Sequence, residues 1–458
     1  MRAAGRRGLG WAFDTVTGLL LGIAIWTLYG RSMSDLIALS TRPEVLWAVC
    51  IGAAVLAVAW PLTILLNWLV LRPRDLIRAR LIGSSVLVGA LCLAIALPLV
   101  VTSRYAYVQH DLLSSVFGGS SGRSGDSARG PAENPWAGRG RIGVLLLGGD
   151  AGPDRTGLRT DTVILASIDT QTGETILFSL PRNLEDAPFP PGELRHAFPH
   201  GFPDLLNAIY PTVEDFRPDL LRGQKDRGAT AIKQAVHEIL GVPVDYYMLV
   251  DLKGFRDLVD ALDGVTVNVK KRISYGGIRV DGSVGPPKGW IEPGVKNMDG
   301  VTTLRYARTR DNSSDYDRIA RQRCVLNAIF DQADPITVLR RYERLAKVAK
   351  DNIKTDVPQD MLPAFIDLSE RIKKASVRSV AFVPPLIATG NPDYELIRKK
   401  TQEALTEPPK KPAPKPGTRD STTAEPEPAT PKRSSPAGDT SPTPVKNPGA
   451  AEDLDSVC

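Results

Sequence analysis

The chain has 458 residues, enough for two or three domains at about 100 to 200 residues each. Its averages, 43% hydrophobic and 24% charged residues, are those of a globular protein. However, apolar residues crowd the amino-terminal part and prolines crowd the carboxy-terminal part, which excludes a single soluble domain. The net charge of +6 is too small to identify a partner by itself. The four cysteines form no CxxC pair and no metal-binding spacing, so neither a disulfide framework nor a zinc site is implied.

Three long apolar stretches open the chain: Phe13–Tyr29, Val45–Leu71 and Leu81–Val101. Each approaches or exceeds the roughly 20 helical residues that cross a bilayer. The first carries Asp14, so a signal peptide is the alternative reading. No small-residue cleavage site follows it, which favours a retained helix. We therefore expect residues 1–101 to form a transmembrane region of three helices.

The arginines predict the orientation of these helices, because basic loops stay in the cytoplasm. They precede the first stretch and fill the short loop between the second and third, at Arg2, Arg6, Arg7, Arg72, Arg74, Arg78 and Arg80. A buried core helix pair is the alternative for the second and third stretches, but the basic loop argues against it. The sequence thus predicts a multi-pass plasma-membrane protein with a cytoplasmic amino terminus, and everything after Val101 is expected to be extracellular.

Two segments have the composition of unfolded chain. Residues 102–140 are rich in Gly and Ser, which predicts a flexible linker. Residues 401–458 are dominated by Pro, Lys, Thr, Ser and Ala, and such a segment buries too little apolar surface to offset the entropy of ordering. One folded extracellular domain, residues 141–400, remains between them.

This domain alternates strand and helix patterns. Strands apolar on both faces predict a central sheet that is covered on each side by helices. The fold class is therefore α/β, a three-layer α-β-α domain with a mixed central sheet, preceded by three transmembrane helices. The expected strands are Ile142–Gly148, Asp161–Ile168, Glu174–Leu180, Tyr246–Val250, Val265–Val269 and Val377–Phe382, and the expected helices are Gly228–Leu240, Leu252–Leu262, Gly300–Thr309, Arg318–Ala333, Pro335–Lys350 and Gln359–Lys374.

Two carboxylates stand at neighbouring strand ends. Asp150 closes the first strand and Asp161 opens the second, in what should be a hairpin-like pair. Mg²⁺ prefers one or two carboxylates, completed by water and phosphate oxygens, so the pair predicts a magnesium site. The alternative is that Asp161 caps a turn and Asp150 is merely solvated.

Arginines gather around the same edge. Arg182 follows the third strand, Arg308 and Arg310 end a predicted helix, and Arg318, Arg321 and Gln322 share one face of the next helix. Guanidinium groups fork onto phosphate oxygens, which indicates a phosphorylated ligand. A solvated, salt-bridged helix face is the alternative. Nucleic acid is not expected as a partner, because no stacking aromatics interleave with these arginines.

Six motifs in order make the chain resemble the LytR-CpsA-Psr family of cell-wall ligases. They span roughly Ile142 to Phe330 and read LLLGGDAG, LRTDTVILASID, LFSLPRN, LLNAIYP, VDYYMLVDLKGFRDLVDALDGVTVNV and MDGVTTLRYARTRDNSSDYDRIARQRCVL. The resemblance implies an enzyme, a transferase of the phosphotransferase type. It would move an anionic glycopolymer, such as teichoic acid, capsule or arabinogalactan, from a polyprenyl-pyrophosphate carrier onto peptidoglycan.

The resemblance also implies roles. Asp150 and Asp161 match the acids associated with Mg²⁺, and Arg182, Arg308 and Arg310 match the arginines that grip the pyrophosphate. Asp315, Arg318, Arg321 and Gln322 match the adjoining D-x-x-R-x-x-R-Q element. The family usually has an aspartate where this chain has Asn183.

The chemistry leaves alternatives open. We expect Asp161, Asp315 and Arg310 to be catalytic, and either acid could accept the proton of the acceptor hydroxyl. A hydrolase of the same lipid pyrophosphate would use the same residues but admit water. A non-catalytic lipid-binding receptor would leave the lipid unchanged.

Overall fold

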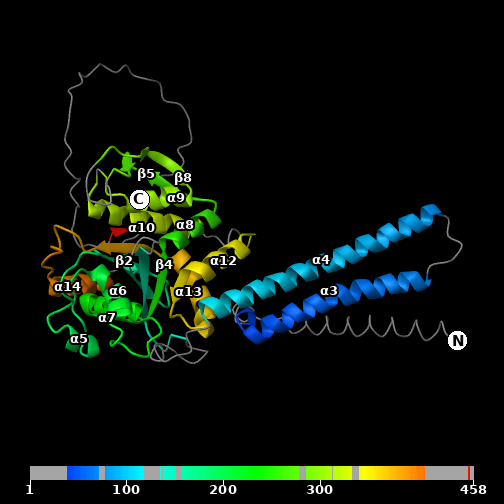
Figure 1. Ribbon diagram of the computed structural model, residues 1–458, viewed down its shortest axis with the longest axis horizontal. Coiled ribbons are helices and arrows are strands. Elements are labelled where there is room, and N and C mark those ends of the chain that lie inside the picture. Colours follow the sequence, from blue (N-terminus) through cyan, green and yellow to red (C-terminus); the bar gives the residue numbers. More distant parts are fainter. Residues whose placement is uncertain are drawn as a thin grey trace, which may run out of the picture.

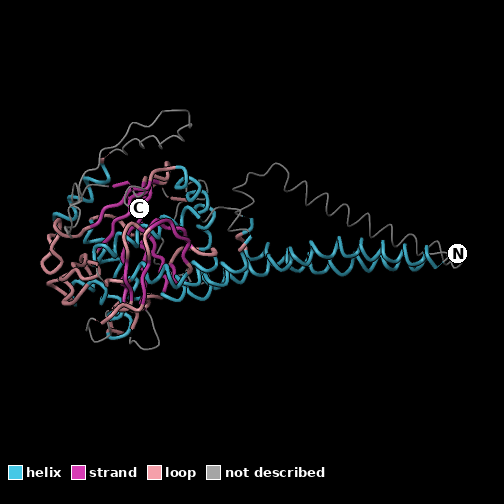
Figure 2. The backbone as a smooth tube through the Cα atoms, turned by 90° about the horizontal axis from the view of Figure 1, so that it is seen from above, coloured by secondary structure: helices cyan, strands magenta, loops and turns pink. Residues whose placement is uncertain are grey.

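The structure is a computed structural model that describes residues 39–71, 78–117, 135–136, 138–150, 157–277, 285–311, 313–332, 340–407 and 452–453. The predicted helix Phe13–Tyr29 lies outside these residues, as do residues 118–134 and 137 of the predicted linker. A folded domain lies at one end of the molecule and a long helical hairpin projects from it (Figures 1 and 2).

The hairpin consists of α3 (Pro43–Leu71) and α4 (Arg78–Val116), which pack side by side. Both are long and apolar enough to cross a membrane by length and composition. Their apolar side chains point outward, with Val58 70% and Leu97 66% exposed. The prediction of two of the three spans is therefore consistent with the structure, and the alternative of a buried core helix pair is wrong.

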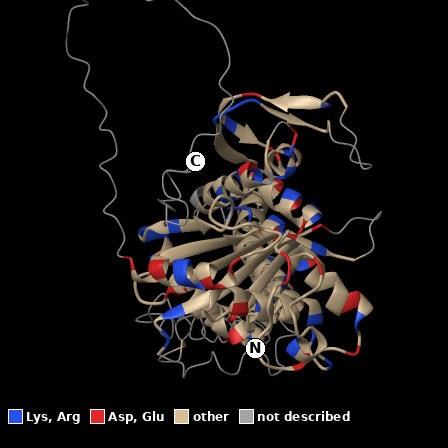
Figure 3. Cartoon of the chain, turned by 90° about the vertical axis from the view of Figure 1, so that its left-hand side faces the viewer, with Lys and Arg blue, Asp and Glu red and all other residues tan. Residues whose placement is uncertain are grey.

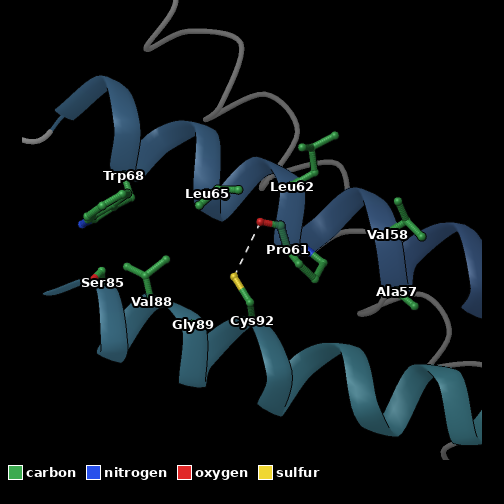
Figure 4. Close-up of a pocket in the computed structure, with 10 residues that line it drawn as sticks. All are labelled: Ala57, Val58, Pro61, Leu62, Leu65, Trp68, Ser85, Val88, Gly89 and Cys92. Atoms are coloured by element: carbon green, nitrogen blue, oxygen red, sulfur yellow. Dashed lines mark hydrogen bonds between the residues drawn. The ribbon is translucent and has the colours of Figure 1, made fainter. Parts of the chain in front are cut away.

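Small residues and a proline hold the hairpin's two helices together. Between them lies an apolar groove of about 480 Å³, lined by Ala57, Gly89 and neighbouring side chains (Figure 4). Across it, the Cys92 thiol donates a hydrogen bond to the carbonyl of Pro61 over 3.6 Å. Closer to the domain, the Ser103 hydroxyl donates to the carbonyl of Cys50 over 2.9 Å.

α4 does not end where its apolar stretch ends. It continues to Val116, so residues 102–116 are helical rather than part of a flexible linker. The reason is burial: Ala106, Leu113 and Val116 are buried, and the first two pack in one cluster with Leu46 and Leu362. The polar composition of this segment concealed that helical stripe.

The central sheet has seven strands in the order β11-β10-β3-β2-β1-β4-β9. Adjacent strands β1 and β2 are antiparallel, as are β2 and β3, while β1 pairs parallel with β4 and β3 with β10. The mixed sheet and the hairpin-like first pair were both predicted. The strand bounds are β1 (Arg141–Asp150), β2 (Arg159–Asp169), β3 (Thr175–Leu180), β4 (Tyr246–Asp251), β9 (Ile353–Thr355), β10 (Val377–Ala381) and β11 (Glu452–Asp453).

Helices cover both faces of this sheet, which confirms the three-layer prediction (Figure 1). Alternate residues of β3 serve the two cores: Phe178 packs on one face and Leu177 on the other. The first face carries α5 (Glu193–Ala197), α6 (Ile209–Pro211), α7 (Arg227–Leu240) and α14 (Tyr394–Thr406), and the second carries α13 (Leu362–Lys374). Short turns of 3₁₀ or π helix lie at Leu206–Ala208, Thr212–Phe216 and Gln359–Met361.

A smaller lobe sits above one edge of the sheet, with its own apolar cluster around Val259, Val267 and Val325. Its strands form separate two-stranded sheets, so the predicted strand Val265–Val269 exists but does not join the central sheet. The lobe contains α8 (Leu252–Ala261), β5 (Val265–Val269), β6 (Ile273–Tyr275), β7 (Gly289–Ile291), β8 (Gly294–Met298), α9 (Gly300–Arg308) and α10 (Asp315–Gln332), and α12 (Tyr342–Asn352) packs against α8 and α4.

Two sequence expectations at the carboxy-terminal end were wrong. The domain does not stop at residue 400, because α14 runs to Thr406 and buries Ile397 and Ala404. The segment 401–458 is also not wholly without structure, since β11 pairs antiparallel with β10.

In addition, Cys324 is disulfide-bonded, whereas Cys50 and Cys92 are free. Spacing rules detect local cysteine pairs only, and none was present.

Candidate functional site

The site begins at an irregularity between β1 and β2. Gly148 pairs with Thr162 and Gly149 pairs with Thr160, so Asp161 is the extra residue of a β-bulge. A bulge bends the strand and re-aims the side chain it carries. Glycine is needed here, because a Cβ on Gly148 would lie 2.9 Å from the Cβ of Thr162. The Gly-Gly pair thus turns Asp161 toward the strand-end side of the sheet.

Asp161 is held by two partners from different segments. Its Oδ1 accepts a hydrogen bond from Nη1 of Arg182 over 2.7 Å and another from Nδ2 of Asn207 over 3.0 Å. Asn207 is 2% exposed, and its backbone N–H donates to the carbonyl of Arg182 over 3.0 Å. These three side chains form a closed unit, which we call the Asp161 network.

The carboxyl group of Asp161 stays ionised at neutral pH. Burial alone would raise the pKa of the Asp161 carboxyl, but the hydrogen bonds from Arg182 and Asn207, with the charges of Arg182 and Arg318, outweigh it and hold the pKa below its usual value. The effect of Arg318 shows that α10 lies close enough to act on the strand-end acids.

A second ion pair joins the smaller lobe to the sheet. Asp150, at the end of β1, is 4% exposed, and its Oδ2 lies 3.2 Å from Nη2 of Arg308 at the end of α9. The Arg308 side chain remains 41% exposed, so its guanidinium also faces solvent. Arg310, two residues on, is exposed. The two acids and the arginines of three elements therefore meet at one edge of the sheet.

The arginines of α10 divide into different environments. Arg318 is buried and its charge acts on Asp161, whereas Arg321 is turned toward α9. Arg321 donates from Nε to the carbonyl of Tyr306 over 2.7 Å and from Nη2 to the carbonyl of Thr309. Burial lowers the pKa of Arg321, although the group stays charged at neutral pH.

Gln322 also reaches the end of α9, although it contacts another carbonyl than Arg321 does. Its Nε2 is 3.5 Å from the carbonyl of Ala307, a weak contact. Arg323, which was not singled out from the sequence, donates to the Ser379 hydroxyl over 2.7 Å and so ties α10 to β10. These contacts place α10 against both the sheet and the end of α9.

Sequence reasoning missed Asn207 as a site residue, although it lies in the quoted motif LLNAIYP. An asparagine before an aliphatic run gives no charge signal, and only the fold brings it to Asp161. The substitution at Asn183 is accommodated locally, because its Nδ2 donates to the Thr389 hydroxyl over 3.0 Å. The carboxylate beside Arg182 is supplied by Asp161 instead.

The chemistry of the two acids fits Mg²⁺. The hydrogen bonds from Arg182 and Asn207 both go to one carboxylate oxygen of Asp161, Oδ1, so within the described residues Oδ2 accepts neither of them. Within the described part of the chain, no group of three or more His, Cys, Asp or Glu residues could hold a metal. Mg²⁺ does not require one, because it is commonly bound by one or two carboxylates together with substrate phosphates. Asp315 begins α10, and its side chain lies outside the described part.

The apolar residues of the first three strands form the hydrophobic core of the domain. The structure places Leu145, Val163 and Ile176 in the core at no more than 1% exposure. These side chains pack the sheet against its helices, so their role is in the hydrophobic core.

The structure is thus an α/β domain that gathers arginines and two acids at one edge of its central sheet. The family model described as the LytR_cpsA_psr family matches residues 120–407, well over half of the chain. The protein therefore belongs to the LytR-CpsA-Psr family.

Named relatives agree with this assignment. One is the polyisoprenyl-teichoic acid–peptidoglycan teichoic acid transferase TagU of Oceanobacillus iheyensis, 29% identical over 231 residues, which are 49% of this chain and 62% of the relative. TagU of Bacillus subtilis is 30% identical over 219 residues, 47% of this chain and 60% of the relative. This chain thus spans less than two thirds of the length of either.

Among solved structures, the crystal structure of gbs0355 from Streptococcus agalactiae is similar over 59% of this chain and 90% of its own length, at 21% identity and a TM-score of 0.45.

Proposed function

We propose that this protein transfers an anionic glycopolymer, with teichoic acid as the first candidate, from a polyprenyl-pyrophosphate carrier to peptidoglycan. Family membership and the names of the TagU relatives support the reaction class. The observation that carries the proposal is the Asp161 network beside the Asp150–Arg308 pair, because it gathers arginines and acids where a diphosphate would lie.

The reaction forms one bond and breaks another. The acceptor hydroxyl of peptidoglycan, the 6-hydroxyl of muramic acid, attacks the phosphorus nearest the polymer. The bond from that phosphorus to the bridging oxygen breaks, and polyprenyl phosphate leaves with the electron pair. No nucleotide is consumed, because the pyrophosphate already holds the free energy. Such transfers depend mainly on positioning and neutralisation of charge.

Each residue then has a role in the proposal. Arg308 and Arg310, both exposed at the end of α9, bind the non-bridging oxygens of the pyrophosphate. Arg182 and Arg318 set the charge around Asp161. Asp150 and Asp161 would hold Mg²⁺, which when bound neutralises charge on the phosphate oxygens.

Two further residues of α10 act indirectly in this proposal. Arg321 and Gln322 hold the end of α9, and thereby Arg308, by their contacts with its carbonyls. They are positioning residues rather than phosphate ligands.

The acceptor proton goes to one of two acids. The lowered pKa of Asp161, with its two hydrogen bonds, makes that carboxylate a weak base and suits it to a metal or orienting role. We therefore assign the proton to Asp315, and Asp161 remains the alternative.

The proposed location is the plasma membrane. The apolar hairpin of α3 and α4 anchors the chain, with the amino terminus in the cytoplasm and the catalytic domain outside, next to the peptidoglycan. Basic loops at residues 2–7 and 72–80 support this orientation.

One experiment tests the reaction. The full-length protein in nanodiscs is incubated with a lipid-pyrophosphoryl oligosaccharide and a peptidoglycan oligomer, with Mg²⁺ or a chelator, and the products are weighed by mass spectrometry. A coupled phosphodiester product that needs Mg²⁺ supports the proposal. Free oligosaccharide phosphate would identify a lipid hydrolase, and unchanged lipid that co-purifies with the protein would identify a receptor. Asp161→Asn serves as the inactive comparison.

A further inference from the structure

A second basic site lies away from the sheet edge, where the hairpin meets the domain. A pocket of about 650 Å³ opens between α4 and the start of α12. Val101 and Arg104 of α4 line one side of it, and Arg340, Arg341 and Arg344 line the other. The two helices lie side by side here (Figure 1). We call this the junction pocket.

The junction pocket keeps a positive charge after its internal ion pairs are formed. Arg104 pairs with Glu343 over 2.5 Å, and Arg344 lies 3.3 Å from Asp263, which also pairs with Arg341. Four arginines thus face two acids. Arg104 and Arg344 are 68% and 63% exposed, so these surface pairs are weak and exchange readily with another anion.

A donor of the pocket residue Arg341 is buried without an acceptor in the described part of the chain. Nη1 of Arg341 is inaccessible to solvent and has no hydrogen-bond partner among the described residues, and the same holds for the hydroxyl of Tyr342, the next residue along the chain. Buried donors are normally satisfied, because leaving one unpaired costs about 1–3 kcal/mol. The amino terminus of α12, for which Arg341 is the N-cap, adds backbone N–H groups and a partial positive charge. Both features favour an anion with several oxygens.

The position of the pocket along α4 selects the kind of anion. Val101 ends the apolar stretch of α4 and also lines the pocket, and Arg104 follows within one helical turn. Just before them, Leu97 and Val100 are 66% and 54% exposed. Tyr105 lies beside Arg104 and its ring stacks on Tyr342 at 5.9 Å, in the position where aromatic residues mark a membrane interface. Arginines therefore lie at headgroup level directly above a lipid-facing apolar surface.

We infer that the junction pocket binds the phosphate headgroup of an anionic phospholipid, whose acyl chains lie along the exposed apolar face of α4. Arg104, Arg340 and Arg344 contact the phosphate from two sides. Such a lipid would join α4 to α12 and set the domain at a fixed height above the bilayer. The inference is independent of the proposed transfer reaction, because none of these residues belongs to the site at the sheet edge.

The test measures which lipids the protein immobilises. Full-length protein is reconstituted in phosphatidylcholine nanodiscs that contain either spin-labelled phosphatidylglycerol or spin-labelled phosphatidylcholine, and electron paramagnetic resonance gives the motionally restricted fraction. We expect the wild type to restrict phosphatidylglycerol preferentially. The double variant Arg340→Gln/Arg344→Gln should lower that preference by about 25-fold, since each basic residue near the surface contributes a factor of about five and the two factors multiply. Both side chains are exposed, so the fold should persist, which circular dichroism checks.

The control is Lys347→Gln, which removes one positive charge from an exposed position one turn further along α12 and outside the pocket, and which is compared with the single variant Arg344→Gln. It should retain the preference. Equal restriction of the two lipids by the wild type, or an equal loss in Lys347→Gln, would overturn the inference. Release of the restricted lipid by inorganic phosphate, but not by chloride of equal ionic strength, would identify a site for a free anion and would also overturn the assignment to a headgroup.

Discussion

Two arginine-containing units of the domain can be compared, one half-buried around Asp161 and one buried in α10. In the Asp161 network, Arg182 pairs with a carboxylate and the hydrogen bonds are among side chains. In α10, Arg321 is equally charged but donates to the main-chain carbonyls of Tyr306 and Thr309. In the Asp161 network, the arginine is held by the charge of a carboxylate. In α10, Arg321 is held by main-chain carbonyls, so an arginine in a basic run can have a purely structural role. Charge patterns do not separate these roles, but their hydrogen-bond acceptors do.

Charged residues of both signs are also interspersed over the face of the domain seen in Figure 3.

The largest expected effect is on activity. Asp161→Asn keeps the shape of the side chain but removes the charge that holds Arg182 and supports the proposed metal, so transfer should fall by about 100-fold or more. The measurement is the rate of coupled product in the nanodisc assay. Asp169→Asn, the same change at the opposite end of β2, is the control and should leave the rate unchanged. A D161N rate within twofold of wild type would remove Asp161 from the site.

The next effect is on stability. Arg321→Gln removes a buried group that satisfies two backbone carbonyls, so the free energy of unfolding should drop by about 2–4 kcal/mol. Arg321→Lys should also destabilise, because an ammonium lacks the guanidinium fork that reaches both carbonyls. Denaturant titration measures both. The comparison variant is Arg217→Gln, whose partner Asp219 is a surface group and whose stability should barely change. Full stability in both Arg321 variants would contradict the structural role.

A smaller effect should appear in the pH dependence of stability. Because the pKa of Asp161 is held below its ordinary value of 3.8, its ionised form stabilises the folded state above that pH. This contribution is lost as the pH falls through the folded-state pKa. The difference in unfolding free energy between wild type and Asp161→Asn should therefore shrink between neutral pH and about pH 3. A difference that stays constant over this range would mean that Asp161 is not charge-stabilised.

The smallest effect on stability should come from Arg308→Gln. Its guanidinium is 41% exposed and its pair with Asp150 spans 3.2 Å, so the free energy of unfolding should change by less than about 1 kcal/mol. Activity should nevertheless fall by at least tenfold if Arg308 grips the pyrophosphate. Measuring both on one preparation separates a ligand-binding arginine from a structural one such as Arg321.

Much of the fold was predictable from sequence. The strongly apolar runs of β1, β2 and β3 and the periodic helices α7, α8 and α9 lie within one or two residues of their predicted limits. The short strands β6, β7, β8 and β9 were missed, because three to five residues with polar neighbours carry no periodic signal. The helical extension of α4 was missed because burial against α12 and α13, rather than composition, stabilises it.

The proximity of the candidate site residues was predictable from sequence, but their contacts were less so. Strand ends and charge runs located Asp150, Asp161, Arg182 and Arg308, and the structure brings these four to one edge of the sheet. The bulge that aims Asp161 and the partnership with Asn207 depend on register and on a distant segment. Neither the bulge nor the contact with Asn207 can be predicted from the spacing of residues along the chain.

Helix α4 runs without a break from the apolar hairpin to the domain, where its last turns pack against α12. A helix advances about 1.5 Å and turns about 100° per residue, so adding one residue after Val101 would rotate that packing face by about a quarter of a revolution around the helix axis. The direction in which the domain faces relative to the hairpin is thereby set by the number of residues in a single helix.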